Sequence, residues 1–523
     1  MKRLLWLATL AFTAALTACG GGGGESIPTP TPTGGFSVSS LKGQYAFLMS
    51  GLDTGGAYLA RTGSFAADGA GNITSGMEDV VDLGVGPIAP VTFGASNYSV
   101  QANGRGVIVL KDSSGSGGLT LTMDLQSPSQ GFLVQTDGNA ATSGNFNLQT
   151  TADLLATSFS GNYVFDFSGA DSSGVNTSII GNIAANGSGA ITGGVINTND
   201  GTNGPSGPVA LTRPGTFSLD PTYGATFGRG TAQFVGHTYA FYIVDATQIM
   251  FLQEDSQGGS SGNAVLQTGT IPTQNPGFTG SFAYLVGGIS TAGSDAAVAR
   301  FTADGAGGVG TISYDENNYG TPLHISQGSN ISSATYVIDT ANAGSGRGTL
   351  TFKDSSHGTF QYVFYLISPT SGVIQDVRSG IVADGTLLAQ TGAPFTLAGL
   401  AGNYAFNWNG VDLSSSSVEN FVGQYVLASS ASNNISGVVD GTIIGSNGIS
   451  GASVTVFSNI GSQGTLTITS DGSTNNAYQI VAGKPLGNTY NYQAYVIDAN
   501  TVFLLGTDSN TRVLAGSVSR QSQ

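Results

Sequence analysis

Charged residues and cysteine are scarce in this chain of 523 residues. Lysine, arginine, aspartate and glutamate make up 9% of it, against about 25% in typical soluble domains. One cysteine excludes an internal disulfide framework. With 15 basic against 31 acidic residues, the formal net charge is −16. Such an acidic chain is a poor candidate for binding nucleic acid or anionic lipid, since both require basic patches.

Hydrophobic and aromatic residues are present in ordinary amounts, at 40% and 9% of the chain. This content is enough to build buried cores, and it argues against a disordered chain, which combines low hydrophobicity with high net charge. The length suggests about three to five domains.

The N-terminus has the layout of an export signal. Lys2 and Arg3 precede an apolar run at residues 4–15, which is too short for a membrane span of about 20 residues. Leu16-Thr17-Ala18-Cys19 then resembles the lipobox of bacterial lipoproteins at all four positions. The resemblance implies cleavage after a signal peptide of residues 1–18 and lipidation of Cys19. The alternative is an ordinary secretory signal with a chance cysteine.

Residues 19–35 predict a tether between the lipid and the folded part. Five glycines follow Cys19, and "ESIPTPTPTGG" comes next. Glycine-rich chain is flexible, whereas a proline–threonine repeat is extended and stiffer. The residue after Cys19 is Gly20 and not aspartate, and in this the sequence resembles lipoproteins that are sorted to the outer membrane. The resemblance therefore implies a lipid-anchored protein of the cell envelope, facing the surface or the periplasm.

Four copies of one unit follow the tether. Each copy begins with hydrophobic-x-G-x-aromatic-x-aromatic, and a second glycine falls eight residues after the first. The first glycines are Gly43, Gly161, Gly280 and Gly402. A period near 120 residues is that of a domain, because solenoid repeats are shorter, at roughly 20–50 residues. The expected domains are 36–152, 153–272, 273–394 and 395–523.

Each unit reads as all-β. Aromatic residues alternate with other residues in the opening motif, as Tyr45 and Phe47 do, which indicates a strand with one buried face. Asp-Gly and Asn-Gly steps predict hairpin turns. Eight strand-like runs begin in the first unit near Gln44, Tyr58, Ile73, Val91, Gly106, Leu119, Gly131 and Asn145. We expect an eight-stranded up-and-down β-barrel in each unit, or alternatively a meander folded into a sandwich.

Some features resemble the calycin group of lipocalins and avidins: a G-x-aromatic motif opens the first strand, and an arginine recurs later. The recurring residues are Arg105, Arg229 and Arg347. The resemblance implies an arginine that stacks on an aromatic ring and closes one barrel end. An arginine on a surface hairpin is the other interpretation. The whole repeat also resembles repeats of uncharacterised bacterial surface and secreted lipoproteins, which carry no assigned activity.

Catalytic and metal motifs do not stand out. The three histidines, His237, His324 and His357, occupy different places in their repeats. No zinc-protease motif, nucleophile elbow or phosphate loop is evident. The sharpest metal hypothesis is calcium at the turns around Asp68 and Asp304, but EF-hand spacing is absent and hairpin turns explain these residues without a metal. We expect no cofactor.

The remaining candidates are paired acids and tryptophan. Glu78 and Asp79 are adjacent, as are Asp315 and Glu316. Adjacent strand residues face opposite sides, so neither pair can easily flank one glycosidic bond. Trp408 continues the aromatic alternation of the fourth copy, so we expect it in a core.

The sequence therefore favours a non-enzymatic surface lipoprotein that serves as an adhesion, binding or spacer module. Its partners would be the membrane, through the lipid on Cys19, and a glycan, a matrix component or a small apolar ligand. A carrier of an apolar ligand inside the barrels is the alternative, and a polysaccharide-active enzyme is less favoured.

Overall fold

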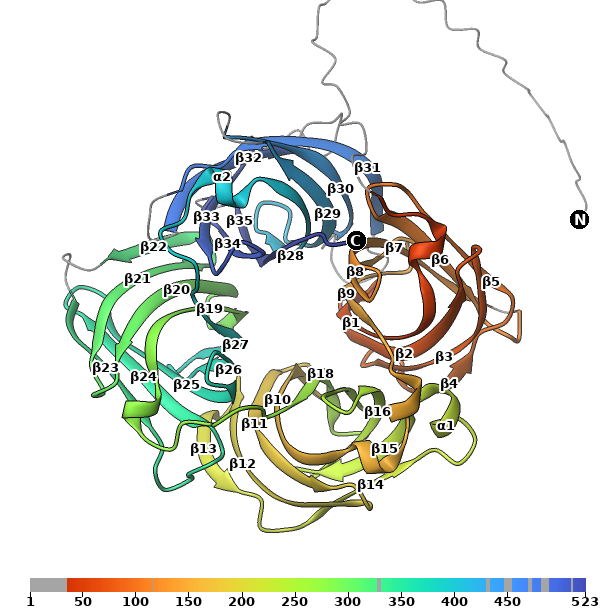
Figure 1. Cartoon of the computed structure of the whole chain (residues 1–523), viewed down its shortest axis with the longest axis horizontal. Helices are drawn as coiled ribbons and strands as arrows, with labels where there is room; N and C mark the ends of the chain where they lie inside the picture. The colour runs from red at the N-terminus through yellow and green to blue at the C-terminus, as the bar shows by residue number, and fades with distance from the viewer. Residues whose placement is uncertain are drawn as a thin grey trace, which may run out of the picture.

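The computed structural model describes residues 35–115, 117–326, 331–428, 433–445, 454–468, 473–480, 489–508 and 511–523. The expected signal peptide, Cys19 and all but the last residue of the tether lie outside these residues. The described part is almost entirely antiparallel β-structure, arranged as four barrels in a ring (Figure 1). The all-β class with barrel domains is confirmed.

The first barrel contains nine strands. They are β1 (Lys42–Asp53), β2 (Tyr58–Asp68), β3 (Asn72–Asp82), β4 (Gly86–Thr92), β5 (Ser96–Val100), β6 (Arg105–Lys111), β7 (Gly118–Ser127), β8 (Gln130–Gln135) and β9 (Ala140–Leu148). Eight of them close the barrel, because β1 pairs with both β2 and β9, and β3 with both β2 and β5. The run expected near Val91 is two strands, of which β4 is an extra strand on β3.

The second barrel repeats this arrangement. Its strands are β10 (Ser160–Asp171), β11 (Asn176–Asn186), β12 (Ala190–Asp200), β13 (Gly204–Ala210), β14 (Gly215–Leu219), β15 (Arg229–Phe234), β16 (His237–Asp245), β17 (Gln248–Gln253) and β18 (Gly258–Leu266). The extra strand is β13, and the pairing of β11 with β12 closes the barrel of eight strands.

The third barrel is nearly closed. Its strands are β19 (Thr279–Ser290), β20 (Ser294–Asp304), β21 (Val309–Asn318), β22 (Thr321–Ser326), β23 (Ile331–Ile338), β24 (Arg347–Asp354), β25 (Gly358–Ser368), β26 (Ser371–Asp376) and β27 (Ile381–Ala389). β22 and β23 end the sheet, and one isolated bridge, between Gly308 and Thr335, links β23 to the start of β21.

The fourth barrel is a closed ring of eight strands. They are β28 (Gly402–Asp412), β29 (Ser417–Leu427), β30 (Asn434–Ile444), β31 (Val454–Thr465), β32 (Ser473–Ile480), β33 (Thr489–Val496), β34 (Thr501–Gly506) and β35 (Arg512–Arg520).

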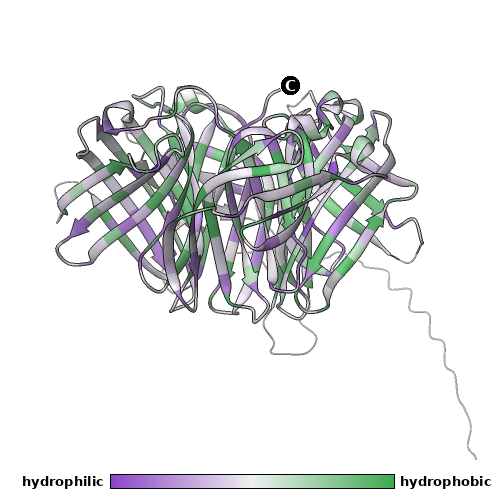
Figure 2. Ribbon diagram, turned by 90° about the horizontal axis from the view of Figure 1, so that it is seen from below, coloured by the Kyte–Doolittle hydropathy of each residue, from purple (hydrophilic) through white to green (hydrophobic). Residues whose placement is uncertain are grey.

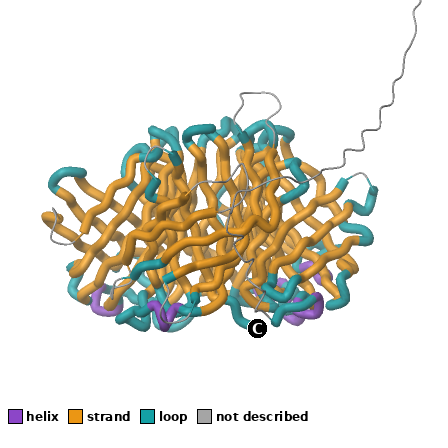
Figure 3. Tube along the Cα trace, turned by 90° about the horizontal axis from the view of Figure 1, so that it is seen from above, coloured by secondary structure: helices purple, strands orange, loops and turns teal. Residues whose placement is uncertain are grey.

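Short helices precede or interrupt the barrels. They are η1 (Val38–Ser40), η2 (Thr151–Asp153), η3 (Ala156–Ser158), α1 (Gly224–Phe227), η4 (Asn275–Gly277) and α2 (Leu397–Leu400). Figure 3 shows the helices on one face of the ring, where the C-terminus also lies. We call this the helix face. The opposite, distal face carries the first hairpin turn of each barrel, at residues 53–57, 171–175, 290–294 and 412–417.

The opening motif closes each barrel at the helix face. Its first residue, Leu41, Phe159, Phe278 or Leu400, is at most 2% exposed and belongs to the barrel core. The glycine two positions later has φ between 109° and 155° in all four copies, a conformation that favours glycine. The chain can therefore turn directly into the first strand after this buried apolar residue, which we call the plug of the barrel.

The second glycine of the motif allows a close approach of strands. A Cβ on Gly51, Gly169, Gly288 or Gly410 would collide with a main-chain carbonyl of the last strand of the same barrel. The repeated spacing of eight thus places glycine where the first and last strands come together.

Aromatic side chains fill the barrel interiors. Phe278 stacks on Phe282 at 4.2 Å between ring centroids and lies 5.3 Å from both Tyr336 and Phe364. Trp408 is 1% exposed and packs on Phe406 at 4.0 Å, so the expected core position of the tryptophan is confirmed. Figure 2 shows hydrophobic and hydrophilic residues alternating along the strands.

We expect Phe278→Ala to lower the free energy of unfolding of the third barrel by about 3–5 kcal/mol, because it empties a plug that the surrounding rings cannot fill. Scanning calorimetry measures the loss. Val337→Ala is the control, since Val337 is 54% exposed in the same barrel and should cost little. Equal losses from the two substitutions would contradict the plug.

Candidate functional site

The recurring arginines lie between barrels and not at a barrel end. Arg229, at the start of β15, donates from Nε and Nη2 to the two carboxylate oxygens of Asp79 on β3 of the first barrel, both at 2.8 Å. Arg105 makes the same bidentate pair with Asp440 on β30, at 2.7 and 2.6 Å. The expectation that these residues stack on an aromatic ring and close a barrel is therefore wrong.

Arg347 occupies the corresponding place between the second and third barrels. Its Nε donates to the Asn197 side-chain oxygen on β12 at 3.0 Å, and its Nη1 donates to Asp339 of its own barrel at 2.9 Å. Each arginine starts the strand equivalent to β6 and reaches the third strand of the preceding barrel. We call each such contact a seam.

A tyrosine accompanies the arginine at two of these seams. Tyr242 pairs with Arg229 across two strands and donates to Asp79 at 2.7 Å, and Tyr365 pairs with Arg347 and donates to Asn197 at 2.9 Å. At the seam between the third and fourth barrels, Tyr495 donates to Asp315 at 2.6 Å. At every seam, therefore, one polar side chain on the third strand of a barrel accepts hydrogen bonds from the next barrel.

A second polar contact repeats at all four seams. A glutamine follows the last strand of each barrel, and its amide Nε2 donates to main-chain carbonyls of the next barrel. The residues are Gln149, Gln267, Gln390 and Gln521. The main-chain N–H of the next residue also donates to that barrel, from Thr150, Thr268, Thr391 and Ser522.

The last of these contacts closes the ring. Gln521 follows the fourth barrel, yet it donates to the carbonyls of Asn103 and Leu125 in the first, at 2.9 and 2.7 Å. Ser522 N–H donates to the Gln126 carbonyl at 2.8 Å. The first and fourth barrels are therefore joined in the same way as barrels that follow one another in the chain.

Apolar clusters lie beside the polar seams. Ala46 and Met77 of the first barrel pack with Phe227 and Met250 of the second. Val164 and Ile180 of the second barrel pack with Val363 and Tyr365 of the third. The barrels therefore bury apolar surface against each other, and the four barrels form one body (Figure 1).

An arginine does close a barrel end, but it is Arg520. Its guanidinium carbon lies 5.2 Å from the ring centroid of Tyr404, and its nitrogens donate to the carbonyls of Gly399, Ala401 and Ala499. No repeated pattern points to Arg520, because it recurs in no other copy. The only signal in the sequence is its position in the last segment of the fourth copy, whose strand pairs with the strand that contains Tyr404.

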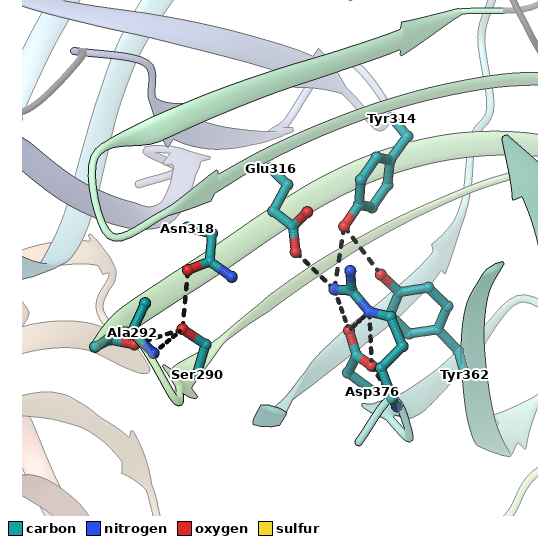
Figure 4. A network of polar contacts seen from close by, with 9 residues as sticks. Ser290, Ala292, Tyr314, Glu316, Asn318, Tyr362 and Asp376 are labelled. Atoms are coloured by element: carbon teal, nitrogen blue, oxygen red, sulfur yellow. Dashed lines mark hydrogen bonds and ion pairs between the residues drawn. The ribbon is translucent and has the colours of Figure 1, made fainter. Parts of the chain in front are cut away.

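The distal end of the third barrel holds a buried charged cluster (Figure 4). Arg378 donates to Asp376 and Glu316, each at 2.6 Å, and lies 4.8 Å from the Phe360 ring centroid. Asp295 is 1% exposed, and neither of its carboxylate oxygens has a hydrogen-bond donor. Burial and the neighbouring Glu316 raise the pKa of Asp295 to about 8. Burial therefore favours the neutral form of this carboxyl.

The first and fourth barrels carry smaller clusters of this type. Arg61 pairs with Glu78 at 3.0 Å inside the first barrel. In the fourth, Arg512 pairs with Asp412 at 2.7 Å and with Glu419 at 3.2 Å. Each cluster contains its own countercharge, as a buried charge requires.

The acid pairs singled out in the sequence do not form catalytic dyads. Glu78 points into the first barrel toward Arg61, whereas Asp79 points outward to Arg229. Asp315 and Glu316 likewise diverge, toward Tyr495 and Arg378. The divergence expected for adjacent strand residues is confirmed.

The proposed calcium turns use their carboxylates locally. One oxygen of Asp68 accepts main-chain N–H groups of Ala70 and Asn72, and Asp304 accepts those of Ala306 and Gly308. The described residues include no group of three or more histidine, cysteine or acidic side chains placed to hold a metal ion.

The three histidines each contact one aspartate and do not meet. His237 lies 3.2 Å from Asp255, His324 lies 2.7 Å from Asp315, and His357 lies 2.7 Å from Asp354. Among the described residues, no helix is long and apolar enough to cross a membrane.

Two clefts lie on the third barrel. One, of about 580 Å³, is bordered by Asn275, Val337, Asp339 and Arg347. The other, of about 370 Å³, lies between the third and fourth barrels and is bordered by Asp295, Asp384 and Asn409 and by several glycines. Their size suits small molecules or protruding side chains.

Comparison with known proteins gives no family. No family model matches the sequence, and no curated protein matches it. Among solved structures, the chain is similar to a mutant of the vaccine antigen transferrin-binding protein B from Haemophilus parasuis. The identity is 9% and the TM-score 0.20, over 75% of this chain and 83% of that chain. So low a TM-score supports no functional conclusion.

Removing one partner of a buried pair should be costly at a seam. We expect Asp79→Ala to destabilise the ring by about 3 kcal/mol, because Arg229 and Tyr242 lose their bonds to Asp79, and Asp220 alone still pairs with Arg229. Thermal unfolding of the full chain measures the loss. Asp304→Ala, which removes an exposed turn cap, is the control and should cost about 1 kcal/mol or less. A larger loss from the control would contradict the seam's role.

Stability should fall as pH rises above the acidic range. Burial raises the pKa of Glu254 to about 8, of Glu419 to about 7 and of Asp384 to about 6. Each group keeps its proton in the folded chain and has lost it in the unfolded chain above about pH 4, so its stabilisation is lost as pH rises through these values. The unfolding temperature measured across this range should fall, and a steady rise would contradict these protonation states.

Proposed function

We propose that the protein is a non-enzymatic, lipid-anchored surface protein whose ring of barrels presents a fixed binding or spacing platform. The observation that carries the proposal is the closed ring. Because four seams hold the barrels together, loops from four repeats keep fixed positions relative to one another. A platform with repeated, fixed contact points gains avidity without strengthening any single contact.

The position of the N-terminal segment supports an outward distal face. Phe36 N–H donates to the Ala102 carbonyl, and η1 follows directly at the helix face. A tether of residues 19–35 that is anchored through Cys19 would then reach the ring at this face. The distal turns would point away from the membrane.

The filled interiors favour an outer binding surface over the carrier alternative. The cores of the first three barrels contain 18 to 23 buried hydrophobic side chains each, and phenylalanine and tyrosine are prominent among them. A small barrel can either be filled by side chains or hold one ligand. These interiors correspond to the first case.

Tagged full-length chains test the anchoring and the orientation. One epitope is inserted between Gly55 and Gly56 on the distal face, and a matched one between Gly69 and Ala70 on the helix face. We expect antibody to label the distal epitope on intact cells more strongly. Cys19→Ser should release the chain from the membrane fraction, because the lipid attachment is lost.

A periplasmic protein serves as the protected control. If both epitopes are as inaccessible as that control, surface display is wrong. If Cys19→Ser leaves the chain in the membrane fraction, the lipid anchor is wrong.

A further inference from the structure

The seam between the first and fourth barrels differs from the others in its covalent connection. Linkers of residues 149–159, 267–278 and 390–401 join the other neighbours. The first and fourth barrels follow each other only in space, and side-chain and main-chain contacts alone hold them together. Loss of these contacts opens the ring, whereas loss of another seam leaves its two barrels linked.

The same seam has a carboxyl group where the others have a phenol. Arg105 pairs across β6 and β7 with Asp124, as Arg229 pairs with Tyr242 and Arg347 with Tyr365. The tyrosines donate to the acceptor on the third strand. Asp124 makes no such bond to Asp440, and an ionised Asp124 places a second negative charge beside that carboxylate.

Two buried carboxyls share one arginine at this seam. Arg105 binds Asp440 through two hydrogen bonds, and Ser458 accepts a third from Nη2 at 2.6 Å. Asp124 is fully buried and has no hydrogen-bond donor on either oxygen, although Gln424 lies beside it. With Asp124 neutral the group has no net charge, and ionisation leaves one buried negative charge without compensation.

The electrostatic environment of Asp124 favours the proton. Burial and the charge of Asp440 hold the pKa of Asp124 well above its usual range, and Arg105 and the Gln424 amide oppose this only in part. Arg105 and Asp440 are the charged groups that face Asp124 from β6 and β30.

The buried apolar cluster at this seam has four members, as many as the cluster between the second and third barrels. Among the described residues, its members are Phe132, Val134, Ala405 and Val422. The cluster between the third and fourth barrels has eight buried members, including Tyr495, Phe503 and Leu505. The closing seam therefore depends more on its polar contacts than its neighbour does.

We propose that the seam between the first and fourth barrels is a proton-controlled latch: the ring is closed while Asp124 is neutral and opens at this seam when Asp124 ionises. The latch rests on the closed ring and not on the membrane anchor. Glu254 and Asp384 also titrate at other seams, but the linkers keep those barrels covalently joined. Complete separation of two neighbouring barrels is thus possible only at the one seam that lacks a linker.

Pulsed electron paramagnetic resonance on the full chain tests the latch. The chain carries Cys19→Ser, and spin labels are attached at Ala102→Cys and Thr465→Cys, two exposed positions on either side of the seam. A second pair, Thr74→Cys and Ala225→Cys, spans the linked seam between the first and second barrels. Distances are measured from about pH 5 to about pH 9.

We expect the first pair to gain a population at long distance as pH rises, and the second pair to stay unchanged. The ratio of open to closed rings should rise by up to tenfold per pH unit, the limit for a single proton. Asp124→Asn and Asp124→Tyr should both keep the short distance at every pH, since neither side chain becomes charged there.

Two results would overturn the latch. The first is a pH-independent distance in the chain with Asp124 intact. The second is an equal lengthening in Asp124→Tyr, which restores the phenol of the other seams and does not rely on the asparagine variant folding.

Discussion

The arrangement of this protein depends on one recurring contact, in which a side chain on the third strand of each barrel is bound by the next barrel. Asp79, Asn197, Asp315 and Asp440 are these acceptors. Three are carboxylates at most 5% exposed, and a buried charge is tolerated only when it is paired and hydrogen-bonded. The acceptor therefore fixes which strands of two barrels face each other, and four such contacts turn a linear series of repeats into a ring.

Closure imposes a further requirement on the repeats. The fourth barrel must offer the first barrel the same contacts that the first three offer their successors. Gln521 and Ser522 meet this requirement, since they repeat the bonds made by Gln149 and Thr150. The same requirement explains why the fourth copy keeps its glutamine and its acceptor although other landmarks have diverged. The residue beside the acceptor differs between seams: it is a tyrosine at three seams and Asp124 at the fourth. In each case this residue contacts another barrel.

The sequence predicted the barrels far better than the ring. Alternating aromatics such as Tyr45 and Phe47 report a local property, the buried face of a strand, so the all-β class followed from them. The eight-residue glycine spacing also acts within one barrel. Arg229 and Gln149 recur just as clearly, but their partners lie in another barrel, and the sequence does not state how barrels are placed. The arginines were therefore expected either at a barrel end, a role that belongs to Arg520, or on a surface hairpin, whereas Arg105 and Arg229 are buried between barrels.

Electron microscopy of single particles of the full chain, at mildly acidic pH, tests the ring most directly. The account predicts four lobes around a closed ring, with the first and fourth barrels in contact in nearly all particles. A row of lobes with variable angles, or a ring with a persistent gap between the first and fourth barrels, would contradict it.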